Sequence, residues 1–466
     1  MWMPITDSMF LLGESREHPL HVGGLQLYKP PEGAGPDFTR ELYRSMIEQA
    51  EVAPLFRRRP RDPVGSLGQL IWKDDDDLDL EYHVRFSALP SPGRVRELLE
   101  LTSRLHGSLL DRHRPLWEFH VVEGLEDGRF ATYVKVHHAL LDGVSALRLL
   151  QRSQSEDPDE RDMPPPWAPS RRPPPPAADR PAEPGGLAGA LAGSLKGMVG
   201  AARAVGDLAG LAPALVRVAN EVMQEQAGQL PFQAPRSMLN VPITGARRFA
   251  AQGWSIERIK AVGRAAGATL NDVMLAMCAG ALRRYMLELD ALPDKPLVAA
   301  VPVSLRGKAG VASGQGNAVG LTLCTLATHL DDPAERLAEI IAGMRRGKRM
   351  YAGLSALQIT ALSAIPMASL LVPPIPGMQR LSPPPFNVLI SNVPGPRRPL
   401  YFNGARLEGV YPVSVPFEFQ ALNITVTSYV DSLEFGLTGC RRTVPHLQRL
   451  LTHLETALAD LEKATA

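Results

Sequence analysis

The sequence predicts an α/β protein built in two halves. Residues 130–136 form a β-branched and aromatic run that is typical of a strand, and a helical pattern follows at residues 144–151. Mixed strand and helix patterns return after residue 231. Between the halves, residues 153–186 are rich in proline and charge, which is typical of an extended connector with little packing. A length of 466 residues allows two or three domains at ~100–200 residues each.

We therefore expect an N-terminal domain over residues 1–153, a proline-rich linker with connecting helices over 154–235, and a C-terminal domain over 236–466. In the C-terminal half, Ser255 is expected to begin a helix that Gly267 ends. Thr269 and Asp272 have the spacing of a capping box. They predict a second helix that runs to about Tyr285. The remaining strands are expected at residues 297–302, 388–391, 423–429 and 432–437.

Composition excludes several classes of protein. The net charge is +1 and 21% of residues are charged, so no basic domain suggests binding to nucleic acid. The three cysteines, Cys278, Cys324 and Cys440, form no CxxC pair. This pattern indicates a reducing compartment and no structural zinc. The N-terminus lacks a basic region followed by an apolar one, so we expect no secretory signal and a cytoplasmic protein.

One long stretch, residues 350–379, carries no formal charge. Four prolines interrupt it, whereas a membrane-spanning helix needs ~20 continuous apolar residues. Two interpretations remain open. The stretch is either a buried core helix followed by a loop, or a surface that touches lipid or a lipid-like substrate.

The residues with the clearest chemical potential lie between the strand at 130–136 and the helix at 144–151. They are His137, His138, Asp142 and Gly143. An imidazole titrates near pH ~6.5 and can accept a proton at neutral pH. A glycine after Asp142 lets the chain turn and lets a ligand approach the backbone. The alternative is that one histidine is a core residue and the aspartate caps the following helix.

Other catalytic schemes lack their motifs. The chain has no GxSxG elbow for a serine hydrolase, no HExxH for a zinc protease and no Walker A loop for a nucleotide. The glycines at 314, 316 and 320 lack dinucleotide-binding spacing. We therefore expect no metal site.

The segment HHALLDG, residues 137–143, resembles the HHxxxDG signature of chloramphenicol-acetyltransferase-type enzymes and of peptide-synthetase condensation domains. Further segments resemble the bacterial wax ester synthase/diacylglycerol acyltransferase family in particular. These are RPLWEFHVVEGL from Arg114, TLNDVMLA from Thr269, VPVSLR from Val301, SNVPGP from Ser391, the opening DSMFLLGESREHPLHVGGL and the ending LNITVTSYVDSLEFGL. The resemblance covers nearly the whole chain outside the connector.

This resemblance implies an α/β fold (an α+β sandwich) of two chloramphenicol-acetyltransferase-like domains, with an active-site tunnel between them. It implies an enzyme that moves a fatty acyl group from acyl-CoA to a long-chain alcohol or diacylglycerol. Acyl-CoA is then a substrate, and no cofactor is expected. It also implies peripheral contact with the inner membrane or with lipid inclusions. It leaves the oligomeric state open.

The resemblance also suggests roles within the motif. His138 is expected to be the general base. Adjacent side chains on an extended segment point to opposite sides, so His137 is expected to pack against or orient its neighbour. Asp142 is expected to be structural, and Gly143 to provide the turn.

Two asparagines are candidates for positioning the acceptor or stabilising the oxyanion. Asn271 lies in the Asn-Asp block and Asn392 lies in SNVPGP. The alternatives are that Asn271 only organises a helix start, as Asp272 does, and that Asn392 only precedes a turn. Structural support of the site is expected from Pro115, Leu116, Trp117 and Asp272. Residues 354–378 and 410–419 are expected to supply apolar lining for the tunnel.

Two other functions remain to be separated from this one. The first is a condensation-type acyltransferase that uses a carrier-protein thioester as donor. The second is a non-catalytic protein of a lipid-inclusion surface that has kept the fold.

Overall fold

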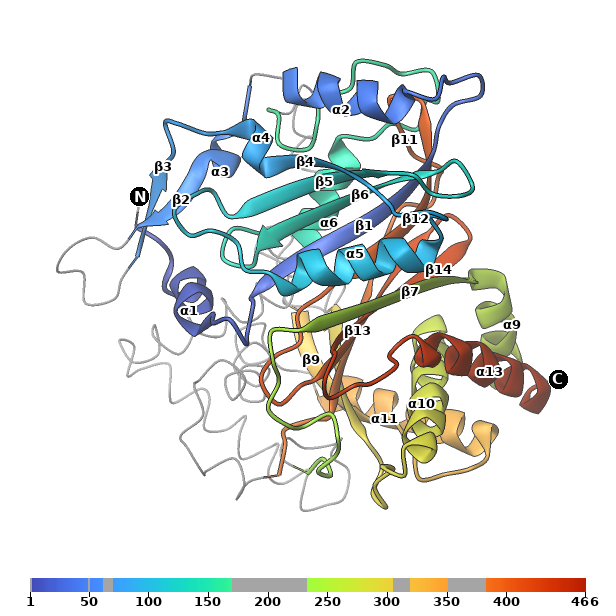
Figure 1. Cartoon of the computed structure of the whole chain (residues 1–466). Coiled ribbons are helices and arrows are strands. Elements are labelled where there is room, and N and C mark those ends of the chain that lie inside the picture. Colours follow the sequence, from blue (N-terminus) through green and yellow to red (C-terminus); the bar gives the residue numbers. More distant parts are fainter. Residues whose placement is uncertain are drawn as a thin grey trace.

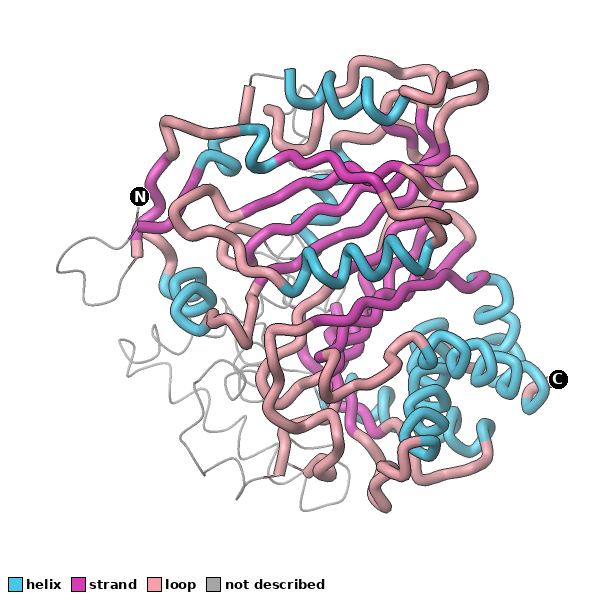
Figure 2. The backbone as a smooth tube through the Cα atoms, in the orientation of Figure 1, coloured by secondary structure: helices cyan, strands magenta, loops and turns pink. Residues whose placement is uncertain are grey.

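The protein contains two six-stranded sheets with helices packed against them (Figure 1). The structure is a computed structural model that describes residues 2–48, 51–61, 70–141, 143–169, 233–304, 319–350 and 383–466. A smaller two-stranded sheet consists of β2 (Arg58–Arg61) and β3 (Ile71–Asp74). Figure 2 shows the strands of both large sheets and the helices around them.

The helices of the described part are α1 (Ile5–Gly13), α2 (Phe38–Glu48), α3 (Pro54–Arg57), α4 (Leu80–His83), α5 (Val95–Gly107), α6 (Gly143–Arg152), α9 (Ile256–Ala266), α10 (Leu270–Glu288), α11 (Pro333–Met350) and α13 (Arg449–Ala464). Its strands are β1 (His21–Lys29), β2 (Arg58–Arg61), β3 (Ile71–Asp74), β4 (Val84–Ala88), β5 (Trp117–Glu123), β6 (Phe130–His137), β7 (Arg247–Ser255), β8 (Val298–Ser304), β9 (Val319–Thr325), β10 (Val388–Val393), β11 (Tyr401–Phe402), β12 (Ala405–Val413), β13 (Leu422–Tyr429) and β14 (Ser432–Cys440).

The N-terminal sheet has the strand order β11-β12-β1-β6-β5-β4. β6 lies in its interior, antiparallel to both β1 and β5, and all eight of its residues are buried. A continuous buried run of this kind is expected for a strand covered on both faces. β6 is therefore a rigid platform for the residues at its end.

Two strands of this sheet come from late in the chain. β12 pairs antiparallel with β1, with Leu25 opposite Tyr411, and β11 pairs with β12. Residues 401–413 therefore complete the N-terminal sheet, although the division of the sequence at residue 236 assigns them to the other half. The domain limits themselves stay a prediction.

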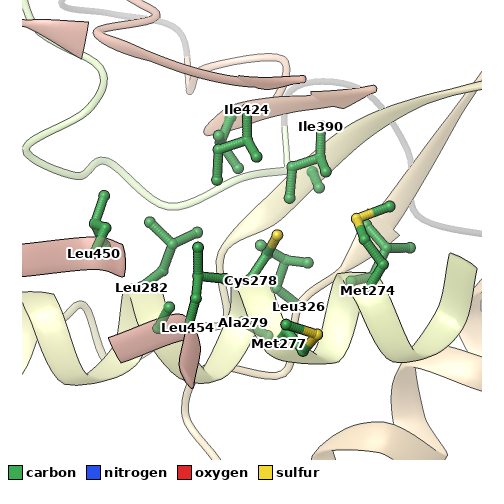
Figure 3. Packing of buried hydrophobic residues seen from close by; sticks show 14 of the residues in the cluster. Met274, Met277, Cys278, Ala279, Leu282, Leu326, Ile390, Ile424, Leu450 and Leu454 are labelled. Carbon is green, nitrogen blue, oxygen red and sulfur yellow. The ribbon is translucent and has the colours of Figure 1, made fainter. Parts of the chain in front are cut away.

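The C-terminal sheet has the order β7-β14-β13-β10-β8-β9. α10 packs against α9, α11 and α13 on one side of it (Figure 1). Nearly every residue of α10 from Asp272 to Met286 is buried, as expected for a helix surrounded by other elements. Figure 3 shows Met274 and Leu282 of α10 in the same apolar cluster as Ile390 and Ile424 of the sheet.

Local sequence signals predicted most of these elements. The strand at 130–136, the helix at 144–151 and the hairpin that corresponds to β13 and β14 are confirmed. Gly267 ends α9 in the left-handed conformation, with φ of 62°. The Thr269–Asp272 capping box begins α10, which runs three residues beyond the predicted end at Tyr285. Ser255 lies at the N-cap of α9, but its side chain makes no capping hydrogen bond.

The prediction of a poorly packed connector is wrong for its first part. Ser155 pairs with Tyr401, and the Trp167 side chain is 1% exposed. Trp167 stacks on Trp117 at 5.5 Å between ring centroids and meets Phe119 edge-on at 5.3 Å. Proline content predicts an extended backbone, but it does not tell whether an aromatic residue within that backbone finds a pocket. The connector beyond residue 169 lies outside the described residues.

Within the described ranges, no single helix is long and apolar enough to cross a membrane. α9 and α10 meet that criterion only together, across a bend of 101°. Most of the uncharged stretch at 350–379 lies outside the described residues.

Candidate active site

The histidine pair lies where β6 ends. The backbone N–H of His137 donates to Leu116 O at 3.0 Å, and that of His138 donates to Leu20 O at 2.9 Å. The N–H of Leu140 then donates back to His137 O at 2.9 Å, which closes a turn. The backbone that carries the two imidazoles is therefore held by the segments before β5 and β1 and by its own turn.

The two ring nitrogens of His137 have different contacts. Its side chain is completely buried, Nδ1 accepts from the N–H of Ala139 at 3.0 Å, and Nε2 lies 3.3 Å from Glu14 Oε1. Because Nδ1 is an acceptor, the neutral ring carries its proton on Nε2, which lies near the carboxylate without forming an aligned hydrogen bond to it. His137 is thus oriented through Nδ1, and its ring is completely buried against Glu14.

Glu14 is the centre of a buried network that sequence reasoning missed. Its Oε1 accepts from the N–H of Leu20 at 3.0 Å, and its Oε2 accepts from Arg112 Nη2 at 3.1 Å. Burial by itself would raise the pKa of Glu14, but the contacts with His137, Leu20 and Arg112 outweigh burial and hold that pKa below its ordinary value. The only signal in the sequence was an acidic residue within the apolar opening segment.

His138 has different surroundings. Its ring stacks on Phe10 with 4.5 Å between centroids and 8° between planes, and the residue is 8% exposed. The regular strand ends at His137, so strand alternation does not govern His138. The two rings have different contacts. The His137 ring faces Glu14, whereas the His138 ring lies against Phe10. Phe10 lies in α1, and Glu14 is the residue that follows the C-terminal end of this helix.

An apolar cluster, called the seam cluster below, surrounds this position and joins the two halves of the protein. It contains Phe10 from α1, Leu116 from the PLW segment and Ala139 from the histidine turn. From the other half it contains Val298, Ala300, Leu321, Leu323, Phe386, Leu389, Val415 and Phe417. Val415 and Phe417 belong to the segment 410–419 that was expected to supply apolar lining, whereas residues 354–378 lie outside the described residues.

The PLW segment contacts β6, the strand that leads to the histidine pair. Pro115, Leu116 and Trp117 are all buried, and Leu116 O is the acceptor for the His137 N–H. Trp117 lies opposite Val136 and donates from Nε1 to Phe56 O at 2.8 Å.

A buried charged group lies further along the strands. Lys135 Nζ lies 3.0 Å from Glu118 Oε2, and His120 Nε2 lies 3.2 Å from the same carboxylate oxygen. Burial opposes ionisation of Glu118, but His120, Lys135 and Arg85 lower its pKa to about 2. The carboxylate therefore stays charged and ties β5 to β6, which stiffens the platform under the histidines.

The other predicted site residues are placed as follows. Asn271 lies in the first turn of α10, and Asn392 lies near the end of β10; both are half-buried. Asp272 Oδ2 accepts from the N–H of Thr269 at 2.9 Å, so this carboxylate organises the helix start. The roles of Asn271 and Asn392 at the reaction centre stay predictions.

Asp142 lies outside the described residues. Gly143 is the first residue of α6, and a Cβ added there would lie 4.0 Å from Val22 Cγ1, an ordinary contact distance. Packing against Val22 therefore does not require glycine at this position. Within the described part of the chain, no group of three or more His, Cys, Asp or Glu side chains is arranged to hold a metal ion.

The two joined sheets, with a strand-end histidine pair in an apolar seam, define an acyltransferase of the two-domain HHxxxDG type. Solved structures with this fold include the first condensation domain of the calcium-dependent antibiotic synthetase. That structure has 17% sequence identity and a TM-score of 0.58, and the match covers 100% of this chain and 96% of the other. At this identity the likeness shows the fold alone.

Closer similarity identifies the family. Residues 3–274 match the wax ester synthase/diacylglycerol acyltransferase catalytic domain, and residues 315–462 match the C-terminal domain of the same family. A protein of Mycobacterium tuberculosis strain H37Rv named as a probable diacylglycerol O-acyltransferase is 55% identical over 464 residues, which is 100% of this chain and 99% of its own. The solved wax ester synthase/diacylglycerol acyltransferase from Marinobacter aquaeolei VT8 has 44% identity and a TM-score of 0.77, with both chains covered completely. The chain belongs to the wax ester synthase/diacylglycerol acyltransferase family.

Proposed function

We propose that this protein transfers a fatty acyl group from acyl-CoA to the hydroxyl of a long-chain alcohol or diacylglycerol, with His138 as the general base. The observation that carries the proposal is the position of His138. It follows the end of an interior strand, its backbone is pinned to Leu20, and its ring faces the apolar seam cluster. The names of the similar proteins agree with this reaction.

The reaction needs no covalent enzyme intermediate. His138 accepts the proton of the acceptor hydroxyl while the oxygen attacks the thioester carbonyl carbon. The carbonyl π electrons move to oxygen and form a tetrahedral oxyanion. The oxyanion then collapses, the carbon–sulfur bond breaks, and the CoA thiolate takes the proton from the imidazolium. The products are an ester and free CoA, and His138 returns to its neutral form.

The surroundings of His138 determine how well this step proceeds. Phe10 stacks against the imidazole, and the seam cluster provides an apolar environment for an acyl chain. Exclusion of water from such a site strengthens each remaining polar contact to the oxyanion. Asn271 and Asn392 are the side chains that we propose for that contact.

We also propose that the protein is cytoplasmic and works at a membrane or lipid-inclusion surface. Trp2 is 62% exposed and Leu12 is 63% exposed, and both lie in or next to α1. The same helix carries Phe10, which contacts His138. A lipid surface that binds these side chains would therefore lie close to the entry for a lipid acceptor.

A carrier-protein donor and a non-catalytic surface role are the competing functions. Condensation domains share the fold at 12–17% identity, which gives no support to a carrier-protein substrate. Supplying the same acyl group on CoA and on an acyl-carrier protein separates the first alternative. A wild-type protein that binds lipid but releases no CoA with any acceptor would establish the second.

The central experiment measures CoA release with acceptors from short alcohols through hexadecanol to diacylglycerol. His138→Ala is expected to lower kcat by ~10²–10⁴-fold, the contribution typical of a general base. His113→Ala is the matched control, because the His113 side chain is 93% exposed. Circular dichroism checks that both variants are folded. His138 is not the base if a folded His138→Ala protein keeps more than a few per cent of the activity.

A further inference from the structure

A pocket of about 550 Å³ lies where four separate segments meet. The segments are the loop between α1 and β1, the C-terminal end of α5, residues 244–247 at the start of β7, and residues 441–442 after β14. Figure 1 shows α5 alongside β7, with the α1–β1 loop near one end of both. Two contacts close the walls of the pocket. The N–H of Arg441 donates to Ala246 O at 2.9 Å, and Gly245 lies so near Arg16 O that a Cβ there would be 2.1 Å from that oxygen.

The lining of this pocket is strongly positive. It contains five arginines and one carboxylate, Glu17, for a formal charge of +5 − 1 = +4. The arginines are Arg16, Arg104, Arg247, Arg441 and Arg442. All of them except Arg247 are exposed, and none of these four exposed arginines forms an ion pair with another described residue. Four unpaired guanidinium groups around one cavity repel each other, and an anion in the cavity would relieve that repulsion.

Arg247 gives the pocket a buried cationic floor. Its residue is 4% exposed, and its guanidinium donates to Thr244 O and, at 3.2 Å, to Glu17 O. It has no ion pair with a carboxylate among the described residues. Burial lowers the pKa of Arg247 to about 10, so the side chain is still charged at neutral pH.

The C-terminal end of α5 would oppose an anion here because helix carbonyls carry partial negative charge. Hydrogen-bond donors offset most of this unfavourable partial charge. Lys135 Nζ donates to Leu105 O at 3.1 Å and to Ser108 O at 3.2 Å, and His21 Nε2 donates to His106 O at 2.7 Å. The carbonyl oxygens of Leu105, His106 and Ser108 thus already accept hydrogen bonds from Lys135 or His21.

Two chain segments connect the pocket to the histidine site. His21 is the cross-strand partner of His137, and His106, whose carbonyl His21 binds, precedes the pocket residue Gly107. On the other wall, Arg16 lies four residues before Leu20, which accepts from the His138 N–H. Four residues span at most about 14 Å. Arg16 therefore lies within about 14 Å of Leu20, and the pocket shares no residue with the seam cluster.

We propose that this arginine pocket binds the phosphate groups at the nucleotide end of acyl-CoA. The inference rests on the proposed function, since it assumes an acyl-CoA donor. CoA carries its thioester at one end of an extended pantetheine arm and its phosphates at the other, so a phosphate site is expected away from the base. Guanidinium groups bind phosphate through two parallel charged hydrogen bonds, which makes arginine the side chain suited to this role.

The test uses the double variant Arg441→Gln/Arg442→Gln in the full chain. Both side chains are exposed, so the substitution should not disturb folding. Calorimetry with CoA itself measures binding without any turnover. The variant is expected to bind CoA at least tenfold more weakly than the wild type and to bind dephospho-CoA with a smaller loss. In turnover, KM for acyl-CoA should rise at least tenfold, whereas kcat/KM for an acyl-N-acetylcysteamine thioester, which has no phosphate, should not change.

The matched control is Arg44→Gln/Arg406→Gln, which removes the same charge from exposed positions outside the pocket and should leave all these values unchanged. Equal CoA affinity in the wild type and the Arg441/Arg442 variant would overturn the proposal. Loss of binding to phosphatidylglycerol vesicles without loss of CoA binding would also overturn it, in favour of a lipid headgroup. If the wild type binds CoA through the pocket but releases none from acyl-CoA, the proposed function fails while the phosphate site stands.

Discussion

Glu14→Gln is the substitution that best tests how the histidine pair is held. The variant keeps the size of the side chain and one carbonyl oxygen, which can still accept from the N–H of Leu20. It removes the charge that faces His137 at 3.3 Å and Arg112 at 3.1 Å. In place of an acceptor it can present an amide donor to the Arg112 guanidinium.

The size of the effect follows from these contacts. Removing one partner of a fully buried ion pair costs ~3–5 kcal/mol, and a hydrogen bond to a charged group is worth ~1.5–3 kcal/mol. The Glu14 side chain is 1% exposed, but that of Arg112 is 45% exposed and regains water when the pair is broken. We therefore expect a loss of about 2 kcal/mol in the free energy of unfolding at neutral pH.

The loss should depend on pH. The folded-state pKa of Glu14 is lowered, so its carboxylate contributes stability above the unfolded pKa of about 4.3, and this contribution disappears as pH falls through the folded value. The difference between the wild type and Glu14→Gln should be largest near pH 7 and should shrink below about pH 4.

The same substitution should lower activity, because Leu20 and His137 both depend on Glu14 and hold the backbone of the base. A misplacement of ~1 Å can cost ~10²-fold, so we expect kcat to fall by roughly tenfold to hundredfold with KM for acyl-CoA unchanged. Urea unfolding and CoA release measure the two effects, with the exposed Glu32→Gln as control. An unfolding free energy within about 0.5 kcal/mol of the wild type, together with kcat within twofold, would refute the role of Glu14.

Two further predictions concern packing and titration. Trp167→Ala should cost ~3–5 kcal/mol in urea unfolding because its ring fills the space against Trp117 and Phe119, and a loss under 1 kcal/mol would mean that the connector does not pack there. Burial raises the pKa of Glu434 to about 7 despite the Ser432 and Tyr411 hydroxyls. The folded state therefore holds a proton that the unfolded state releases, and wild-type stability should fall by up to about 3 kcal/mol between pH 4.5 and 7. Glu434→Gln should lack this fall, and parallel stability curves for the two proteins would contradict it.

Much of the fold followed from short-range patterns. The β-branched run before the histidine pair, the Thr269–Asp272 box and the left-handed Gly267 each specify their local conformation through neighbours a few residues away. The strand-turn-helix setting of His137 and His138 was accessible in the same way. The opening, PLW, Asn-Asp and SNVPGP segments then indicated the family, which the comparisons show.

Long-range pairing was not accessible from the sequence. No strand was expected at residues 405–413, and only the tertiary structure shows that β12 pairs with β1, nearly 400 residues earlier, rather than with its own half. Any strand edge offers the same backbone donors and acceptors, so the choice depends on which side chains the completed sheet buries. The packing of Trp167 was missed for the same reason, because composition describes a segment without describing the pocket that receives it.

The sequence by itself determined the motif and its local strand-turn-helix setting, and it predicted His138 as the base. Only the tertiary structure decided what surrounds that side chain. It brought Glu14 to His137, Phe10 to His138 and five arginines from four segments to one cavity. The physical reason is that a charge or a ring acts over a few ångströms in space. Separation along the chain does not tell which groups the packing of two sheets will place within that range.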